Sequence, residues 1–268
     1  MQALQAFEIH HDIPEADYHQ RAGCSASQLR TLLTKSAAHL QHQRRQPQEE
    51  TAALRVGRLL HCMVLTPGLV KANFTIAPDI NRRTNAGKEE WERFIAANSS
   101  KTVVTHDEWD DANGMAQAAQ STGLFSKGQP EISIFGSMNG VDVKGRLDWF
   151  NAGEIIDVKS TSSVASPREF QRTVWNWGYG LQAAFYMRMA RAAGLSPSKF
   201  VFVAVEKEAP HVVGVYDLDP TVIELFDRQI DDLIEEYKQS LVVDVARSWG
   251  RHTISIPTWA KAGLEDEA

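Results

Sequence analysis

The sequence predicts a mixed α/β fold in which a central β-sheet is flanked by helices and preceded by a helical extension. The first observation is a run of short segments between residues 131 and 160 that alternate apolar and polar residues and are separated by turn-forming dipeptides. The second is helical periodicity on both sides of this run. The third is a length of 268 residues with 43% hydrophobic residues, enough for one large domain with a sizeable core. We therefore expect residues 1–268 to form a single domain, mainly helical over 1–125 and sheet-centred over 126–268.

Composition excludes several classes of protein. The chain has no run of about 18 apolar residues, as a membrane span would need, and its first residues lack the features of a signal peptide. Cys24 and Cys62 cannot form a disulfide framework or a four-cysteine zinc or iron–sulfur site, so we expect a reducing cytoplasm. The net charge is −6, but 14 acidic and only 6 basic residues lie from Val205 onward. The preceding part is therefore mildly basic, and a polyanion such as DNA remains a possible ligand.

The N-terminal half predicts mainly helices. Residues 1–20 are expected to form an extended entry segment that ends in a turn. Ser25 or Ser27 can cap a helix over residues 25–45, which Pro47 ends. The following expected elements are a helix over 50–66, a strand over 73–78, a polar loop over 81–87, a helix over 88–100, a strand over 101–105 and a helix over 107–125.

The C-terminal half predicts the sheet. The strand over 131–140 ends in Asn139-Gly140, which is typical of a tight hairpin. The remaining expected elements are strands over 141–150 and 154–160, a helical run over 166–194 with a break near Gly178, strands over 199–207 and 211–218 that pair with each other, an amphipathic helix over 220–244 and a loop-like acidic end over 248–268.

Two carboxylates and a lysine lie on adjacent expected strands. Asp148 stands late in one strand, and Asp157 and Lys159 stand in the next, across a short turn. Neighbouring strands can bring both carboxylates to one edge of the sheet, where they repel each other unless a cation lies between them. Carboxylate oxygens favour Mg²⁺ or Mn²⁺, and the alternation of a strand puts Lys159 on the face of Asp157. An ammonium at that position can orient a water molecule and neutralise charge on a phosphate.

Further residues accompany this pair in a fixed order. Glu131 opens the first strand of the meander, and Gln182 and Tyr186 are four residues apart on one helical face. A single aspartate on a strand is usually solvated or caps a turn, and an Asp-x-Lys triplet occurs by chance in many proteins. The ordered set is much less common, so we interpret it as functional.

These residues resemble the PD-(D/E)xK nuclease core with the Q-x-x-x-Y extension of RecB-type nucleases. The chain is similar over most of its length to the RecE (exodeoxyribonuclease VIII) nuclease domain and its phage-encoded relatives. The matching stretches are DIPEADYH, CSASQLRTLLTKSAAHL, GRLLHCMVLTP, PDINRRTNAGKEEWERF, VDVKGRLDWF, IIDVKS, GYGLQAAFYMRMA, FVFVAVEKEAPHVVGVYDL and IPTWA. The family's literal Pro-Asp is Leu147-Asp148 here, which matters little because proline is not a ligand.

The resemblance implies a role for each matching residue. Asp148, Asp157 and the carbonyl of Val158 match metal ligands, and Lys159 matches the catalytic lysine. His61 matches a helix-borne histidine that reaches the metal, although a histidine between Leu60 and Cys62 is by itself more often a core residue. The remaining catalytic positions matched are Glu131, Gln182 and Tyr186. The expected fold is a restriction-endonuclease-like core with an N-terminal helical extension.

The resemblance also implies an activity and its partners. We expect a Mg²⁺-dependent 5′→3′ exonuclease on linear double-stranded DNA, in which Mn²⁺ can replace Mg²⁺, that leaves 3′ single strands for recombination. The expected assembly is a ring-like homo-oligomer, a tetramer, with a single-strand annealing protein of the RecT type as partner. Two alternatives stay open: a structure-specific or single-strand DNA nuclease of repair, and a catalytically inactive DNA-binding relative.

Other side chains are weaker candidates for contact with DNA. Arg82 and Arg83 lie in a polar loop, and Arg146 should share the face of Asp148, where it could steady a phosphate or the acidic residues. A cluster of three aromatic residues could stack on an unpaired base, although core packing or a subunit contact is commoner for such clusters: Trp175, Trp177 and Tyr179.

Overall fold

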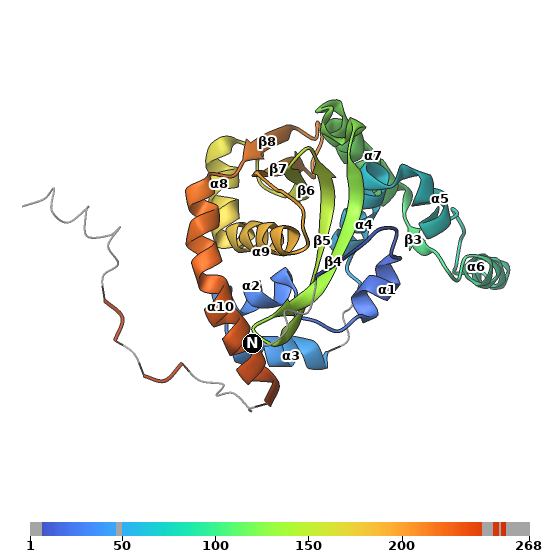
Figure 1. The fold of residues 1–268 in the computed structure, drawn as a ribbon. Coiled ribbons are helices and arrows are strands. Elements are labelled where there is room, and N and C mark those ends of the chain that lie inside the picture. Colours follow the sequence, from blue (N-terminus) through green and yellow to red (C-terminus); the bar gives the residue numbers. More distant parts are fainter. Residues whose placement is uncertain (1–6, 47–49, 243–248, 252, 256–268) are drawn as a thin grey trace, which may run out of the picture.

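The computed structural model describes residues 7–46, 50–242, 249–251 and 253–255 (Figure 1). The helices of eight or more residues are α2 (Ala26–Thr34), α3 (Ala37–Arg45), α4 (Ala52–Leu65), α6 (Asn85–Ala97), α7 (His106–Ser121), α8 (Pro167–Asn176), α9 (Tyr179–Ala192) and α10 (Pro220–Val242). The shorter ones are α1 (Glu15–Gln20), α5 (Val70–Asn73), η1 (Pro67–Leu69) and η2 (Leu124–Ser126). A search of these residues finds no helix with the length and apolar character needed to cross a membrane.

Six strands form the central sheet in the order β1-β4-β5-β6-β7-β8. Their bounds are β1 (Glu8–His10), β4 (Gln129–Met138), β5 (Val141–Asn151), β6 (Glu154–Thr161), β7 (Lys199–Glu206) and β8 (Val213–Asp217). All neighbouring strands are antiparallel except β6 and β7, which are parallel. The chain passes from β6 to β7 through α8 and α9. Asn139 and Gly140 both have positive φ angles in the β4–β5 turn, which confirms the predicted hairpin.

Helices cover both faces of the sheet (Figure 1). On one face, α2, α3, α8, α9 and α10 enclose a core with the β4 and β5 residues Ile134 and Val143. On the other face, α4 and α7 pack on alternate residues of β6 and β7, such as Val158 and Val203. Because successive strand residues point to opposite faces, Asp157 points toward the face of α9 and Val158 toward that of α4. The predicted architecture, a central sheet flanked by helices, is confirmed.

The strands β5 and β6 separate at the point where the sequence places its acidic residues. Their pairing includes Trp149 with Ile156 and ends there, so the next residues in register are Asp148 and Asp157. Beyond this point β6 continues to pair with β7, while β5 continues with β4. The sheet therefore opens between two adjacent strands, with one carboxylate on each side of the opening.

The structure corrects two local predictions and confirms a third. The helix expected over 25–45 is two helices, because the side chain of Ser36 accepts a hydrogen bond from the backbone of His39 and starts α3 anew. In the segment expected to be extended over 1–20, the described residues from 7 onward form more than an extended chain: β1 pairs with β4, and α1 follows. The break near Gly178 is confirmed, since its φ of 62° separates α8 from α9. Most of the expected loop over 248–268 lies outside the described residues.

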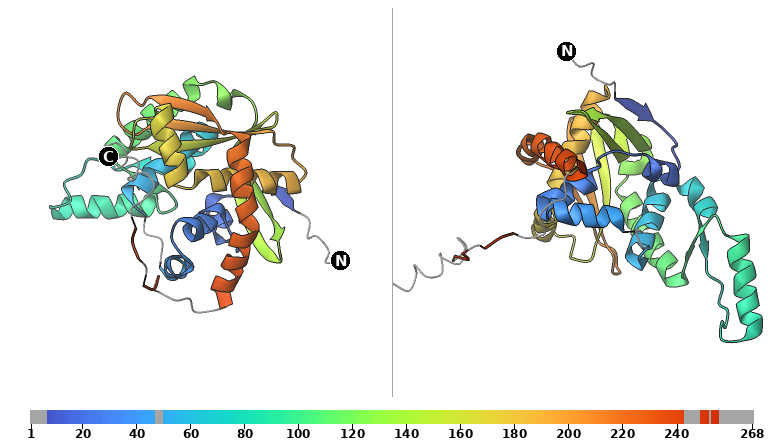
Figure 2. Two further views of the ribbon diagram at one scale, coloured as in Figure 1. Left: turned by 90° about the vertical axis from the view of Figure 1, so that its left-hand side faces the viewer. Right: turned by 90° about the horizontal axis from the view of Figure 1, so that it is seen from below.

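An arm extends from the body of the molecule (Figures 1 and 2). It contains α5, α6 and a two-stranded parallel sheet of β2 (Phe74–Ile76) and β3 (Thr102–Val104). The loop before α6 is closed by hydrogen bonds from the backbone N–H and hydroxyl of Thr84 to the carbonyl oxygen of Asn81. A Cβ on Gly87 would lie 2.1 Å from that oxygen, so only glycine fits at this close approach.

Candidate active site

Asp148 is held in place by the strand that carries Asp157. The backbone N–H of Val158 donates a hydrogen bond of 2.9 Å to Asp148 Oδ2 across the opening between β5 and β6. Burial raises the pKa of Asp148; the charge of His61 lowers it, and the neighbouring charge of Asp157 raises it further. The site is thus a place where a negative charge is costly without a nearby cation.

Asp157 is almost fully buried and meets two side chains at once. Its Oδ1 accepts a hydrogen bond of 2.8 Å from Gln182 Nε2 on α9. Its Oδ2 is paired with the ammonium of Lys159. The carboxylate is therefore oriented from two sides, by Gln182 at one oxygen and by Lys159 at the other.

Lys159 lies between a carboxylate and an aromatic ring. Its Nζ faces Asp157 and lies 5.0 Å from the ring centre of Tyr179, a cation–π distance. Burial alone lowers the pKa of the Lys159 ammonium, but the charges of Asp157 and Asp148 outweigh it and raise the pKa above its usual value. Lys159 is consequently a fixed positive charge at the opening of the sheet.

His61 reaches the same opening from α4. Its Nε2 lies 3.1 Å from the carbonyl oxygen of Val158, and its Nδ1 lies 3.6 Å from Asp148 Oδ2. The helix points this side chain at the sheet because its neighbours Leu60 and Cys62 are buried in the core between α4 and β6. The histidine therefore belongs with the carboxylates and is not only a core residue.

Glu131 completes the acidic side of the site. It falls opposite Asp148 in the β4–β5 register, between paired residues on either side, and has a φ of 51° that non-glycine residues rarely adopt. Strained backbone of this kind is typical of functional sites. Burial raises the pKa of Glu131; the charge of Arg146 opposes this, and that of Asp148 adds to it.

Arg146 holds Glu131 and the N-terminal segment together. It donates to Glu131 Oε2 at 2.8 Å, to Ser133 Oγ at 3.0 Å and to the carbonyl oxygen of Ile13 at 2.9 Å, and its guanidinium lies over the ring of Tyr18. Only 10% of this side chain is exposed. Of the two roles expected for it, the geometry favours steadying the acidic residues, because its donors are occupied by protein groups.

Tyr186 supports the site from behind. It lies one helical turn after Gln182 on α9 and packs across β5, where a Cβ on Gly145 would come within 3.2 Å of its ring. Burial raises the pKa of its phenol well above 10. The two residues of the Q-x-x-x-Y pair therefore have different roles. Gln182 contacts the carboxylate of Asp157, and Tyr186 packs α9 against the sheet.

The donors at the opening are of the kind that a divalent cation takes. They are two carboxylates, one imidazole and the carbonyl oxygen of Val158. The carboxylates of Glu131, Asp148 and Asp157 outnumber the two cations Arg146 and Lys159. The site therefore keeps one net negative charge when His61 is neutral. Within the described ranges, no three His, Cys, Asp or Glu side chains form a ready group that could hold a metal ion. The donors are thus of the right chemical kind for a metal ion, but they are not gathered into a metal-binding group, and Lys159 occupies part of the space around Asp157.

The expected DNA contacts outside the site do not touch its acidic residues. Arg82 and Arg83 are exposed on the arm, where Arg82 stacks on the ring of Trp91 at 4.3 Å. Trp175 and Trp177 are exposed at the end of α8, and Trp175 packs against Phe226 of α10. The structure does not bring these residues into contact with the acidic cluster.

Sequence reasoning missed the contact of Tyr179 with Lys159. Tyr179, Gln182 and Tyr186 have the spacing i, i+3, i+7, which puts all three on one face of α9. That signal was available once Gln182 and Tyr186 were assigned to the site. The contact of Arg146 with Ile13 had no local signal, because the two residues are far apart in the sequence.

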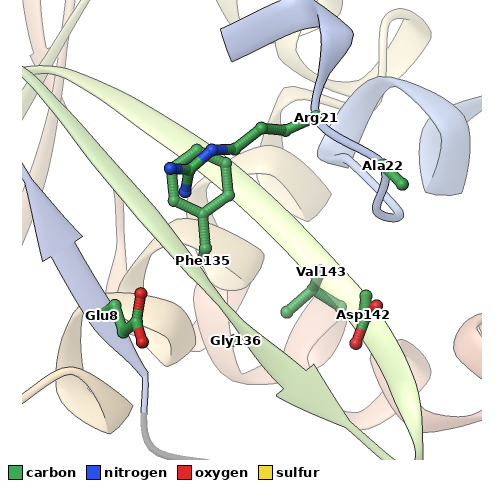
Figure 3. Close-up of a pocket in the computed structure, with 7 residues that line it drawn as sticks. All are labelled: Glu8, Arg21, Ala22, Phe135, Gly136, Asp142 and Val143. Atoms are coloured by element: carbon green, nitrogen blue, oxygen red, sulfur yellow. The ribbon is translucent and has the colours of Figure 1, made fainter. Parts of the chain in front are cut away.

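A separate open pocket of about 450 Å³ lies between β1, β4 and the segment after α1 (Figure 3). The guanidinium of Arg21 covers the ring of Phe135 there, with Glu8 and Asp142 at the sides. None of the carboxylates of the candidate site lines it.

Comparison with known proteins gives one family and a similar structure. The profile of a family described as "PDDEXK-like domain of unknown function (DUF3799)" matches residues 25–246. A crystal structure of a protein from Eubacterium rectale, provisionally assigned as an exonuclease, matches with a TM-score of 0.58 and 13% identity and covers 94% of this chain and 98% of the other. No curated protein matches. At this identity the structural likeness shows the fold alone.

Proposed function

Since the chain belongs to the PDDEXK-like family, we propose that it is a metal-dependent exodeoxyribonuclease that hydrolyses linear double-stranded DNA in the 5′→3′ direction. The observation that carries the proposal is the meeting of Asp148, Asp157 and Lys159 where β5 and β6 separate, with His61 beside them. A structural role alone would not need two buried acidic residues on adjacent strands to share one lysine. The cost of burying these charges is understandable if they bind a cation and a phosphate.

Four groups would hold the metal ion: Asp148, Asp157, the carbonyl oxygen of Val158 and His61. When bound, a divalent ion supplies an activated water molecule and offsets the charge that develops on the phosphoryl group. Mg²⁺ is favoured because most of these donors are oxygens, and the imidazole makes Mn²⁺ a suitable replacement.

The protein residues orient the reacting groups. Lys159 can donate a hydrogen bond to the attacking water and to a non-bridging phosphate oxygen, since its ammonium stays charged at neutral pH. Gln182 fixes one oxygen of Asp157, and Lys159 pairs with the other. Glu131, held by Arg146, is a further acceptor for a water molecule on the acidic side.

The finer points of the proposal rest on resemblance. Exonuclease action agrees with the assignment of the Eubacterium rectale protein. The 5′→3′ direction, the 3′ single-stranded product, the ring-shaped tetramer and an annealing partner of the RecT type follow only from the similarity to RecE-type nucleases. A role of Arg82 and Arg83 in DNA binding is consistent with their exposure on the arm.

The first test is digestion of end-labelled linear duplex in Mg²⁺, with a covalently closed circle beside it. We expect the linear DNA to be degraded and the circle to persist, and labels at the 5′ and 3′ ends give the direction. Asp157→Ala should reduce digestion to background, whereas Asp232→Ala, an exposed position on α10, should leave it unchanged. Continued Mg²⁺-dependent digestion by Asp157→Ala would contradict the assignment of the site.

Other outcomes select the alternatives. Cleavage of the circle would indicate an endonuclease, and preference for single strands would indicate a repair-type nuclease. Absence of Mg²⁺ and Mn²⁺ binding in calorimetry, together with retained DNA binding, would indicate an inactive relative.

A further inference from the structure

A half-buried arginine without a carboxylate partner lies beside the candidate site. Arg30 belongs to α2, which packs against α9 (Figure 1). Its Cγ and Cδ lie 3.2 and 3.6 Å from the position that a Cβ would take on Gly178, so its aliphatic part rests on the turn between α8 and α9. Glycine at this turn is what allows the arginine to lie so close.

Arg30 differs from the other half-buried arginines of the described chain because it forms no ion pair. In the described part of the chain, each of the other half-buried arginines forms an ion pair with a carboxylate: Arg55, Arg58, Arg146 and Arg188. Arg30 has no such partner among the described residues, and the remaining arginines are exposed. A cation fixed by packing but not neutralised by the protein is suited to an external anion.

Tyr179 connects Arg30 to the catalytic lysine. Tyr179 directly follows Gly178, on which Arg30 packs, and its ring centre lies 5.0 Å from Lys159 Nζ. Burial raises the pKa of the Tyr179 phenol; the charge of Lys159 lowers it, that of Asp157 raises it and that of Arg30 lowers it. Lys159 is paired with Asp157, whereas Arg30 pairs with no carboxylate among the described residues. The turn at Gly178 therefore places an unpaired cation next to the residue that contacts Lys159.

Trp177 provides an aromatic surface at the same turn. It directly precedes Gly178, 59% of it is exposed, and it makes no ring contact with another described residue. Its neighbour Trp175 differs, because it packs against Phe226 at a ring-centre distance of 5.5 Å. In proteins that bind single-stranded DNA, exposed aromatic rings near positive charges commonly stack on unpaired bases.

We propose that Arg30 and Trp177 form a subsite for single-stranded DNA next to the catalytic centre, in which Arg30 binds a backbone phosphate and Trp177 stacks on the adjoining unpaired base. The subsite rests on the proposed nuclease function, because it takes the strand whose scissile phosphate lies at Lys159. It would hold the DNA end open, so that the cleaved strand enters the gap between β5 and β6 without its complement.

Binding measurements test the subsite without cleavage. The probe is a short fluorescent oligothymidylate in metal-free buffer, titrated at several salt concentrations. Arg30→Ala should weaken binding about tenfold and reduce the slope of log K against log salt by about 0.7, the value for one phosphate of a single strand. The matched control is Arg191→Ala, an exposed arginine at the far end of α9 that forms no ion pair with a described residue, which should change neither quantity.

The aromatic part has its own readout. Oligothymidylate should quench part of the tryptophan fluorescence of the wild-type protein, and Trp177→Phe should remove most of that quenching while keeping the affinity. Trp177→Ala should weaken binding about tenfold. Circular dichroism of each variant identifies any loss of fold, and Arg30→Lys, which keeps the charge, should recover part of the salt slope.

The outcomes separate this inference from the nuclease proposal. If the wild-type protein cleaves linear duplex and Arg30→Ala retains its KM, affinity and salt slope, the subsite is wrong and the nuclease stands. If no DNA is cleaved with Mg²⁺ or Mn²⁺ but binding depends on Arg30 and Trp177, the subsite stands and the nuclease proposal fails.

Discussion

Asp148 carries a charge that the folded protein accommodates poorly without a metal ion. Burial raises its pKa, so in the metal-free folded state it binds a proton more tightly than in the unfolded chain. Its contribution to stability is therefore complete at low pH and is lost as the pH rises through the raised value. A raised pKa in a site of this kind indicates function at the expense of stability.

We expect Asp148→Asn to stabilise the metal-free protein at neutral pH while abolishing cleavage. The amide keeps an acceptor for the N–H of Val158 and removes the buried charge. The gain should be on the order of 1 kcal/mol and should vanish as the pH approaches the ordinary value for aspartate. Urea denaturation at several pH values measures it, and a loss of stability at neutral pH would contradict this account.

Lys159 neutralises the other acidic residue, so its removal should affect folding as well as catalysis. Lys159→Met leaves Asp157 buried without a counter-charge, which costs about 3–5 kcal/mol. Cleavage should fall at least about 100-fold. In the double variant Lys159→Met/Asp157→Asn most of the stability should return without activity, and equal stability of the single and double variants would show that the pair is not coupled.

At the scale of elements, the sequence predicts what local chemistry determines. The meander over residues 131–160 is readable because alternation and the Asn139-Gly140 turn are local signals, and the β4–β5 hairpin confirms it. The short β1 strand is stabilised by pairing with β4, more than 100 residues away in the sequence. Its three residues are too few to show the alternation that predicts a strand. The division of the helix at Ser36 had a local signal, because serine is a common N-cap residue. The sequence alone does not show whether a serine within a helical run starts a new helix, since this depends on packing.

The packing of α9 against α10 positions Gln182, and Gly180 makes that packing possible. A Cβ on Gly180 would lie 2.3 Å from the ring of Phe226. Gly180→Ala should therefore destabilise the protein by about 1–3 kcal/mol, as overpacking does, and should lower cleavage by displacing Gln182 from Asp157. Thermal denaturation and a nuclease assay measure the two effects.

Gly57→Ala is the matched control for this prediction. It lies inside α4, and a Cβ there would meet no atom within 4 Å. Because alanine favours helix by up to about 1 kcal/mol over glycine, this variant should be slightly more stable than wild type. Equal effects of the two substitutions would mean that the ring of Phe226 does not determine the position of α9.

At the scale of the whole molecule, the site draws on segments spread across the chain. The acidic residues and the lysine were predictable from their order along two adjacent strands, whereas His61 could be assigned only by resemblance because one helical histidine has no distinctive spacing. The roles of Tyr179 and Arg30 depend on how α2, α8 and α9 pack, which no local pattern encodes.

We expect Mg²⁺ to stabilise the protein, and more so at pH 8 than at pH 5. Binding to the folded state alone contributes about 2.7 kcal/mol at a hundredfold excess over Kd. Protons compete for Asp148 and Glu131, and because burial raises the pKa of both, the competition begins at a higher pH than for exposed carboxylates. Melting temperatures with Mg²⁺ or EDTA test this, and an unchanged Mg²⁺ effect in Asp148→Asn would place the ion elsewhere.

The segment around α1 is bound to strand β5 by buried cations. Lys144, two residues before Arg146 on β5, donates to the carbonyl oxygens of Tyr18, His19 and Arg21 at 2.6–3.1 Å. Removing the residues before α2 would remove all three carbonyl acceptors and leave the buried Lys144 ammonium without these hydrogen bonds. Shortened versions prepared for crystallisation should therefore keep residues 13–21, even though the family match begins only at residue 25.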